Sequence, residues 1–462
     1  ARWLPVDDLK AWDFRRADGK AAGIFLGYRD SRPVGITDDR HILTVAGSRS
    51  GKGVSLIIPN LLLYDGSVLA IDPKGELAAL TFGARTEKDQ SCFALDPFGV
   101  SGQPCARFNP LDEIDPESDF AVDDAGNLAG ALIATPERGE RHWSDSAREL
   151  VRALILLVLT FPKSERDLLA VRQLLTLSAP EFHSIGAPEA RRQALFDTMQ
   201  KCTQYAVVRR AGFSFAAVEE RELSGIFSTA RTQTQFLDSP HIARVLAAGS
   251  APQFRLSDLK AKKTTIYLCL PAGRMGEFAP WLRLIIDLAL VSFERERQIT
   301  PDIPVLVVMD EFPVLGHMKS IEVAAGQIAG FGVRLWTVLQ DLTQISRIYK
   351  ESWQTFIGNA GILTFFGNTD EMTLGFVSRK LGTRTMIVEE PSNATFQARL
   401  SGAPPTNRQM RSAPLLSPAE VEQVLSRQKG RVLVFASGLP PVILKRAFYY
   451  DPADPLLAAD RK

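Results

Sequence analysis

The sequence is poor in the residues that build metal and disulfide sites. Its 462 residues include four cysteines and five histidines. The cysteines lie far apart, and neither a C-x-x-C pair nor an H-E-x-x-H motif occurs. These absences argue against a zinc ribbon or a disulfide framework, and they fit a reducing cytosolic setting.

Excess charge and long apolar runs are missing as well. The formal net charge is +1, so any binding of nucleic acid would depend on a local patch or pore rather than on a global basic field. The most apolar run, from Leu150 to Phe161, is short and contains Arg152, which predicts a buried helix and not a membrane span. No signal peptide is visible.

The chain does contain an alternation of strand-like and helix-like segments. Its length predicts two domains, or one domain with an insertion. Short apolar runs that end at turn residues and precede helical patterns indicate an α/β fold with a mostly parallel sheet. From about Phe120 to Ala251, apolar residues recur at helical spacing instead. We therefore predict a main domain built from residues 1–119 and 256–462, interrupted by an all-α domain over residues 120–255.

The segment Ala46–Gly53 has the layout of a phosphate-binding loop, because it lies between a predicted strand and the helix-like run Val54–Leu63. In such a loop, backbone N–H groups and the helix N-terminus contact phosphate oxygens, and Lys52 would reach the β- and γ-phosphates. The match to G-x-x-x-x-G-K-[ST] is imperfect, since Ala46 replaces the first glycine and Gly53 replaces the Mg²⁺-binding hydroxyl residue. Taken alone, the segment predicts either a nucleotide site or a Gly/Ser-rich turn.

The run Val305–Glu311 is the second strong signal. A wholly apolar strand is typical of a parallel sheet buried on both faces, and ligands bind at the carboxyl ends of such strands. There Asp310 would hold Mg²⁺ and Glu311 would polarise the attacking water. Alone, this run could be a strand that leaves the core; together with the Lys52 loop it predicts an ATPase. Gln340 ends the next strand. There it is either a γ-phosphate sensor, as a polar residue at this place can be in RecA-like ATPases, or an ordinary exposed glutamine at a strand end.

Several roles stay open at this level. Asp72 and Lys74 either line the same site or form a turn. Neither Ser50 nor Ser55 occupies the usual position of the Mg²⁺ hydroxyl ligand. The stretch Arg209–Phe215 either touches nucleic acid or forms a solvated loop. If subunits share sites, the candidates for an arginine finger are Arg49, Arg231, Arg334 and Arg347, and each of them could instead be an ordinary surface or salt-bridged arginine.

The last part of the chain predicts one long loop and two closing strands. Residues 391–413 hold Pro, Ser, Asn and Arg without periodicity, which predicts an exposed loop. The closing strands are expected at Arg431–Phe435 and Val442–Tyr450.

These residues resemble those of the type IV secretion coupling proteins, the conjugative DNA-transfer ATPases of the TraG/TraD-like family. The run Gly47–Gly53 with Ile58–Leu62 looks like their nucleotide loop, and glycine after the lysine is common in that family. Further segments match in order over nearly the whole chain: Asp72–Glu76, Asp96–Phe98, Phe108–Leu111, His142–Trp143, Ala147–Arg148, Met309–Phe312, Gly330–Gly332, Leu339–Gln340 with Gln344, Gly358–Asn359 and Tyr449–Tyr450.

The resemblance implies a RecA-like P-loop NTPase domain, an inserted all-α domain and a homo-hexamer around a central channel. It implies ATP and Mg²⁺ as cofactors, and ATP-driven transfer of relaxase-bound single-stranded DNA, or of effector proteins, into a type IV secretion channel. Lys52, Asp310, Glu311 and Gln340 carry over as phosphate lysine, Mg²⁺ ligand, catalytic base and sensor. Nucleotide contacts carry over to the loop residues Gly47, Ser48, Arg49, Ser50, Gly51, Lys52, Gly53 and Val54.

Members of this family usually have N-terminal transmembrane helices, whereas this chain begins at Ala1 without one. We expect that they were removed, that the remaining part is soluble, and that the protein works at the cytoplasmic face of the bacterial inner membrane. The expected partners are the relaxosome, the ATPases of the secretion channel and inner-membrane components. Two other interpretations stay open: a RecA-like translocase for double-stranded DNA, and a scaffold that binds nucleotide without turnover.

Overall fold

The computed structural model describes residues 1–5, 8, 12, 14–16, 18–37, 39–134, 141–249, 253–391, 406–454 and 456–457. The chain divides into two compact units, the first formed by residues 1–64 and 337–460 and the second by residues 65–336. The second boundary falls inside strand β8 (Val333–Leu339). Over the described ranges, no helix is long and apolar enough to cross a membrane.

The first unit contains strands in the order β2-β1-β13-β12-β9-β3. Strands β3 (His41–Ala46) and β9 (Ala360–Phe366) are parallel, and Ala46 pairs with Phe366, so both strands end at the same edge. The neighbouring pairs on the other side of β9 are antiparallel. They are formed by β1 (Ile24–Arg29), β2 (Arg32–Ile36), β12 (Arg431–Ala436) and β13 (Val442–Lys445).

The helices of the first unit flank these strands. A π-helical segment over Gly53–Ile57 leads directly into α1 (Ile58–Leu63), with Pro59 in the first turn of α1, where its missing N–H is tolerated. The other helices are α13 (Leu342–Tyr349), α14 (Trp353–Asn359), α15 (Glu371–Leu381) and α17 (Pro418–Val424).

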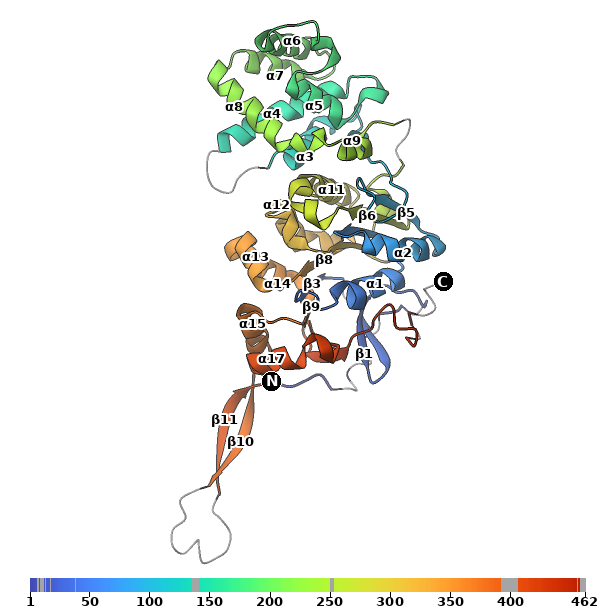
Figure 1. Ribbon diagram of the computed structural model, residues 1–462, viewed down its shortest axis with the longest axis vertical. Helices are drawn as coiled ribbons and strands as arrows, with labels where there is room; N and C mark the ends of the chain where they lie inside the picture. The colour runs from blue at the N-terminus through green and yellow to red at the C-terminus, as the bar shows by residue number, and fades with distance from the viewer. Residues whose placement is uncertain are drawn as a thin grey trace, which may run out of the picture. The chain divides into compact units, whose positions relative to one another are not determined.

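A long β-hairpin projects beyond α15 and α17 (Figure 1). Its strands β10 (Thr383–Pro391) and β11 (Thr406–Pro414) pair along their whole length, so the predicted loop over residues 391–413 is wrong where β11 lies. Residues 392–405 of that prediction lie outside the described part. Ile387 and Met410 face each other across the hairpin and are 62% and 79% exposed. Because the hairpin has no buried face here, the alternation that reveals a half-buried strand is missing.

The second unit contains the strands β7-β4-β6-β5, which are all parallel to their neighbours. Their bounds are β4 (Val68–Asp72), β5 (Ser91–Leu95), β6 (Thr264–Cys269) and β7 (Val305–Met309). Every residue of β4, β6 and β7 is buried, as expected when helices cover both faces of a parallel sheet. The associated helices include α2 (Glu76–Glu87), α11 (Met275–Arg295) and α12 (Lys319–Gln327).

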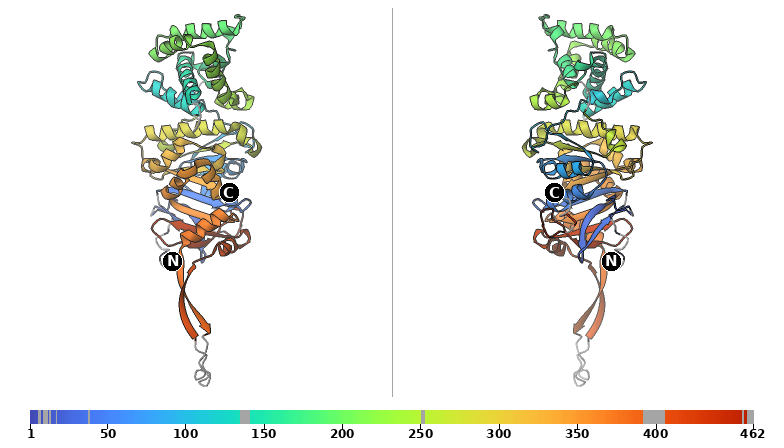
Figure 2. Two further views of the ribbon diagram at one scale, coloured as in Figure 1. Left: turned by 90° about the vertical axis from the view of Figure 1, so that its left-hand side faces the viewer. Right: turned by 90° about the vertical axis from the view of Figure 1, so that its right-hand side faces the viewer.

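A group of helices follows β5 in the second unit. The described residues between Ala121 and Leu246 form helices and turns without a strand, and both side views show them as one group (Figure 2). The helices are α3 (Ala121–Leu132), α4 (Arg141–Val158), α5 (Leu168–Thr176), α6 (Pro188–Gln200), α7 (Ala206–Ala216), α8 (Glu220–Gln233) and α9 (Pro240–Leu246). The expectation of a solvated loop over Arg209–Phe215 is wrong, because this stretch belongs to α7. The bounds 120–255 for a separate domain stay a prediction.

Candidate functional site

The predicted phosphate loop leaves β3 at a point where only glycine fits. A Cβ on Gly47 would lie 1.8 Å from the carbonyl oxygen of Gly367, whereas real Cβ contacts essentially never fall below 3.0 Å. Ala46 is the last residue of β3 and is fully buried, so its methyl group fills core space. The glycine missing at position 46 is therefore not needed there, because the close approach of two backbones falls on residue 47.

Left-handed residues shape the middle of the loop. Arg49 has φ 54° and Gly51 has φ 90°. Left-handed residues within a turn let successive N–H groups converge and form an anion-binding concavity. For Arg49, a non-glycine residue, this conformation is sparsely populated and costs roughly 1–3 kcal/mol, which is typical of ligand-binding segments. A Cβ on Gly53, in contrast, would meet open space, so no neighbour in the described part of the chain demands glycine at that position.

The carbonyl groups of the loop are held by hydrogen bonds. The oxygen of Ser50 accepts from Nη1 of Arg446 at 2.6 Å, and that of Gly51 accepts from the backbone N–H and the hydroxyl of Ser55 at 3.0 and 2.7 Å. In a trans peptide the C=O and the following N–H point in opposite directions. The N–H groups of Gly51 and Lys52 therefore point away from these partners, toward the opposite side of the loop.

The two serines near the loop differ in what their hydroxyls do. The Ser55 hydroxyl already donates to Gly51 and accepts from Arg446, so it is committed to the protein itself. The Ser50 hydroxyl is buried and has no hydrogen-bond partner within the described residues. Neither position replaces the hydroxyl that Gly53 lacks, but Ser50 retains hydrogen-bonding capacity inside the loop.

Gln340 and the phosphate loop share a neighbour that the sequence did not reveal. Asn368 follows Gly367, which packs against the loop, and its Nδ2 donates to the backbone oxygen of Gln340 at 3.0 Å. The N–H of Gln340 donates to Oε1 of Gln344, also at 3.0 Å. The Oδ1 atom of Asn368 is buried and finds no hydrogen-bond partner in the part of the chain that the structure describes. One available signal was the position of Asn368 two residues after the apolar end of β9, at the edge where ligands bind.

The carboxylates Asp310 and Glu311 belong to the second unit and follow its buried strand β7. Both are partly buried. Glu311 has φ 60° and ψ 44°, a left-handed conformation that a glutamate rarely adopts, and its N–H donates to Oδ1 of Asp310 at 3.1 Å. This turn directs two consecutive carboxylates at the end of a strand, and such strain is typical of functional positions.

Asp72 lies at the same edge, because Ile71 of β4 pairs with Met309 of β7. Burial raises the pKa of Asp72 to about 6, and the nearby charge of Asp310 raises it as well. The N–H groups of Ala78 and Lys74 donate to its two carboxylate oxygens at 2.8 and 3.4 Å. Asp72 therefore organises the turn into α2, which is one of the two roles that the sequence left open.

The four candidates for an arginine finger differ in exposure. Arg334 is fully buried in β8. Arg231 donates through Nε to the oxygen of Leu175 at 2.7 Å and stacks over Phe227. Arg49 and Arg347 are exposed on the first unit. A side chain that reaches a neighbouring subunit must be accessible, so Arg49 and Arg347 remain the better candidates.

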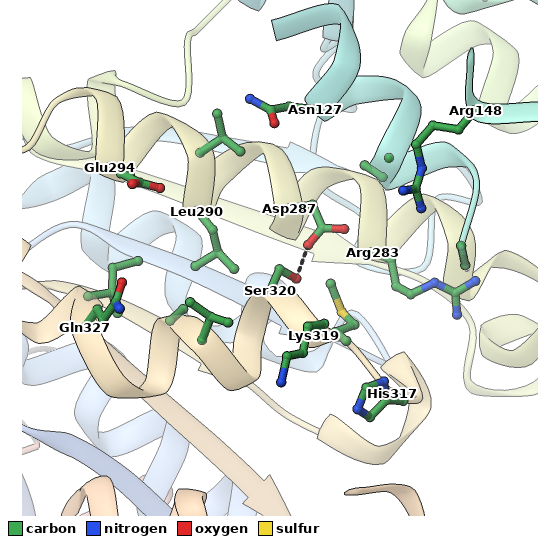
Figure 3. Close-up of a pocket in the computed structure, with 18 of the residues that line it drawn as sticks. Asn127, Arg148, Arg283, Asp287, Leu290, Glu294, His317, Lys319, Ser320 and Gln327 are labelled. Carbon is green, nitrogen blue, oxygen red and sulfur yellow. Dashed lines mark hydrogen bonds between the residues drawn. The ribbon is translucent and has the colours of Figure 1, made fainter. Parts of the chain in front are cut away.

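The second unit also contains a cavity of about 920 Å³, lined mainly by residues of α3, α4, α11 and α12 (Figure 3). Asp287 of α11 and Ser320 of α12 lie side by side in its lining, and the Ser320 hydroxyl donates to Oδ1 of Asp287. Burial raises the pKa of Asp287 to about 6, although Ser320 and the charge of Arg283 act in the opposite direction. None of the residues predicted to bind nucleotide lines this cavity.

An α/β fold with a mostly parallel sheet, a glycine-dependent loop after β3 and an Asp-Glu pair after β7 define a RecA-like P-loop NTPase with a helical part. The chain belongs to the type IV secretory system conjugative DNA transfer family, whose model matches residues 3–460. This result confirms the resemblance and the fold class predicted from the sequence.

Individual relatives agree with this assignment. Protein VirD4 of Rhizobium radiobacter is 30% identical over 463 residues, covering 97% of this chain and 63% of VirD4. The chain thus spans about three fifths of the length of that relative. Among solved structures, the plasmid coupling protein TrwB in complex with the non-hydrolysable ATP analogue ADPNP has a TM-score of 0.67 at 16% identity, covering 97% of this chain and 95% of TrwB. TrwB in complex with ADP and Mg²⁺ has a TM-score of 0.63 at 17% identity, covering 89% and 85%.

Proposed function

We propose that this chain is the ATP-hydrolysing part of a coupling protein that delivers substrates to a type IV secretion channel. The observation that carries the proposal is the conformation of the loop over Gly47–Val54. Hydrogen bonds hold the carbonyl groups of Ser50 and Gly51, and the N–H groups that follow them therefore point to the opposite side of the loop. An array of N–H groups at a helix start, next to a lysine, suits the phosphates of a nucleotide. Nucleotide complexes of TrwB, which shares the fold, agree with this assignment.

The proposed roles follow from chemistry and position. Lys52 supplies the charge for the β- and γ-phosphates, and Gln340 senses the γ-phosphate from a position fixed by Asn368. Asp310 holds Mg²⁺, and Glu311 orients and deprotonates the attacking water. Oxygen ligands suit Mg²⁺, which neutralises phosphate charge when bound. Because Gly53 contributes no hydroxyl, phosphate oxygens, water and Asp310 would supply most of the Mg²⁺ ligands.

The proposed cargo is single-stranded DNA attached to a relaxase, or an effector protein. Six copies would surround a central channel at the cytoplasmic face of the inner membrane, together with the relaxosome, the channel ATPases and inner-membrane components. A candidate DNA contact lies on α7, where Arg210 and Phe213 stand three residues apart and are exposed, Phe213 by 59%. An exposed aromatic ring beside a cation suits stacking on an unpaired base.

The test is ATP hydrolysis by the purified chain with and without single-stranded DNA. We expect hydrolysis to be stimulated by DNA, and Glu311→Gln to lower turnover by a factor on the order of 100 or more while ATP binding survives, because the amide cannot accept a proton. Phe213→Ala should weaken only the stimulation. Stimulation by double-stranded DNA alone would favour a double-strand translocase. ATP binding without hydrolysis in hexamer-forming conditions would favour a scaffold.

A further inference from the structure

Arg446 contacts the phosphate loop from the far end of the chain. It follows β13 directly and is 3% exposed. Its Nη1 donates to the Ser50 oxygen at 2.6 Å and to the Ser55 hydroxyl at 3.1 Å, and its Nη2 donates to the Arg427 oxygen at 3.3 Å. The sequence predicted a strand through Tyr450 here. That prediction is wrong beyond Lys445, because the chain leaves β13 to reach the loop.

A buried guanidinium needs an explanation, because an apolar side chain would fill the same space without loss of hydration. Burial lowers the pKa of Arg446 to about 10, which reflects that loss. Among the described residues, no carboxylate forms an ion pair with it. Instead it lies over the rings of Phe366 and Phe448, with its Cζ 4.5 and 5.4 Å from their centroids. The contacts that require an arginine are therefore those to backbone oxygens and to one hydroxyl.

The hydrogen bond to Ser50 acts on a peptide group that the loop needs. The Ser50 carbonyl and the Gly51 N–H belong to one trans peptide, so holding the oxygen on the Arg446 side directs the N–H to the other side. If this peptide turned over, a carbonyl dipole would face the phosphates and repel them. A Cβ on Gly51 would lie 3.5 Å from Arg446 and 4.0 Å from Phe448, so this face of the loop is already occupied by protein.

A second anchor lies three residues further along. The N–H of Tyr449 donates to the oxygen of Val54 at 3.0 Å. The segment from Arg446 to Tyr449 thus holds a carbonyl on each side of Lys52, one at Ser50 and one at Val54. This segment packs against one face of the loop and leaves the opposite face accessible to a ligand.

We propose that Arg446 is a positioning residue that fixes the Ser50–Gly51 peptide in the orientation that binds the phosphates of a nucleotide. The inference rests on the proposed nucleotide function. Arg446 itself does not contact the nucleotide in this proposal. A change at Arg446 should therefore weaken the binding of the triphosphate group and not that of the base.

The experiment compares the binding of MgATP and of inorganic tripolyphosphate, which contacts only a phosphate site, by titration calorimetry. The variants are Arg446→Gln, which removes the charge and most donors, and Arg446→Lys, which keeps the charge. Lys445→Gln, at the exposed preceding residue, is the matched control. We expect Arg446→Gln to weaken both ligands by the same factor, on the order of tenfold, Arg446→Lys to weaken them less, and Lys445→Gln to leave both unchanged.

Several results would overturn the inference. One is wild-type affinity for both ligands in folded Arg446→Gln, as checked by circular dichroism, even if its unfolding temperature falls. Another is weakening of ATP alone, which would place the effect at the base. If Arg446→Gln does not fold, Arg446→Lys decides: weaker binding of both ligands supports the role, and unchanged binding contradicts it. If the wild-type protein binds neither ligand, the proposed nucleotide function fails instead.

Discussion

Asp287 should make the stability of the second unit depend on pH. Burial in the cavity beside Ser320 raises the pKa of this carboxyl group from 3.8 to about 6. The folded protein therefore holds the proton more tightly than the unfolded chain. The resulting stabilisation is fully present below about pH 4 and is lost as the pH rises through about 6. A pKa difference of roughly 2, at about 1.36 kcal/mol per unit, corresponds to an upper limit of roughly 3 kcal/mol in the free energy of unfolding.

The perturbation is Asp287→Asn, because a carboxamide keeps an oxygen that accepts from Ser320 but carries no charge. Urea unfolding of wild type and variant, followed by circular dichroism between pH 4 and 8, gives the difference in unfolding free energy at each pH. The contributions of the other carboxylates to the pH dependence are common to both proteins and cancel in this difference. We expect the free energy of unfolding of the variant, relative to that of the wild type, to increase by up to roughly 3 kcal/mol as the pH rises from 4 to 7.

Ser320→Ala provides an independent check. The Ser320 hydroxyl stabilises the ionised carboxylate, so its removal should raise the pKa of Asp287 further and move the loss of stability to higher pH. A difference between Asp287→Asn and wild type that stays constant across the pH range would refute the argument that burial of this charge is unfavourable. A move of the transition to lower pH in Ser320→Ala would refute the role given to the hydroxyl.

Two further predictions concern the phosphate loop. Gly47→Ala should weaken ATP binding by a factor on the order of ten or more, because its Cβ would lie 1.8 Å from the Gly367 oxygen and must displace the loop; unchanged affinity by calorimetry would contradict this. Gly53→Ser has space for its side chain, and its hydroxyl should lower the Mg²⁺ concentration needed for half-maximal ATP hydrolysis by a few-fold, measured against Gly53→Ala, which adds the Cβ alone. Equal Mg²⁺ requirements in the two Gly53 variants would contradict the prediction that a hydroxyl at this position helps to bind Mg²⁺.

Much of the fold could be predicted from the sequence, because the elements that carry it are locally encoded. The run Val305–Met309 is wholly apolar and forms a strand that is wholly buried, and the pattern over Glu371–Leu381 forms α15 within the same bounds. The loop at Lys52 and the pair Asp310–Glu311 could be recognised because each follows such a strand. The roles of these residues in catalysis stay predictions, since they depend on a bound nucleotide.

Other features depended on tertiary contacts. Ile387 and Met410 on one face of the hairpin β10–β11 and Met386 on the other face are all exposed, so its strands show no alternation of buried and exposed residues in the sequence. Whether position 46 or 47 needs glycine depends on the backbone of Gly367, which parallel pairing of β3 and β9 brings alongside.

The same reason applies to the surroundings of the phosphate loop. Arg446 holds the Ser50 carbonyl across 396 positions of the chain, and Asn368 holds the Gln340 carbonyl from beyond the end of β9. The sequence near Arg446 and Asn368 does not indicate their partners. These partners are backbone carbonyl groups, which every residue has, so no residue type marks them in the sequence. The sequence by itself predicted a phosphate loop and where it lies. Only the tertiary structure decided which way the peptide groups of that loop point, because distant side chains hold them.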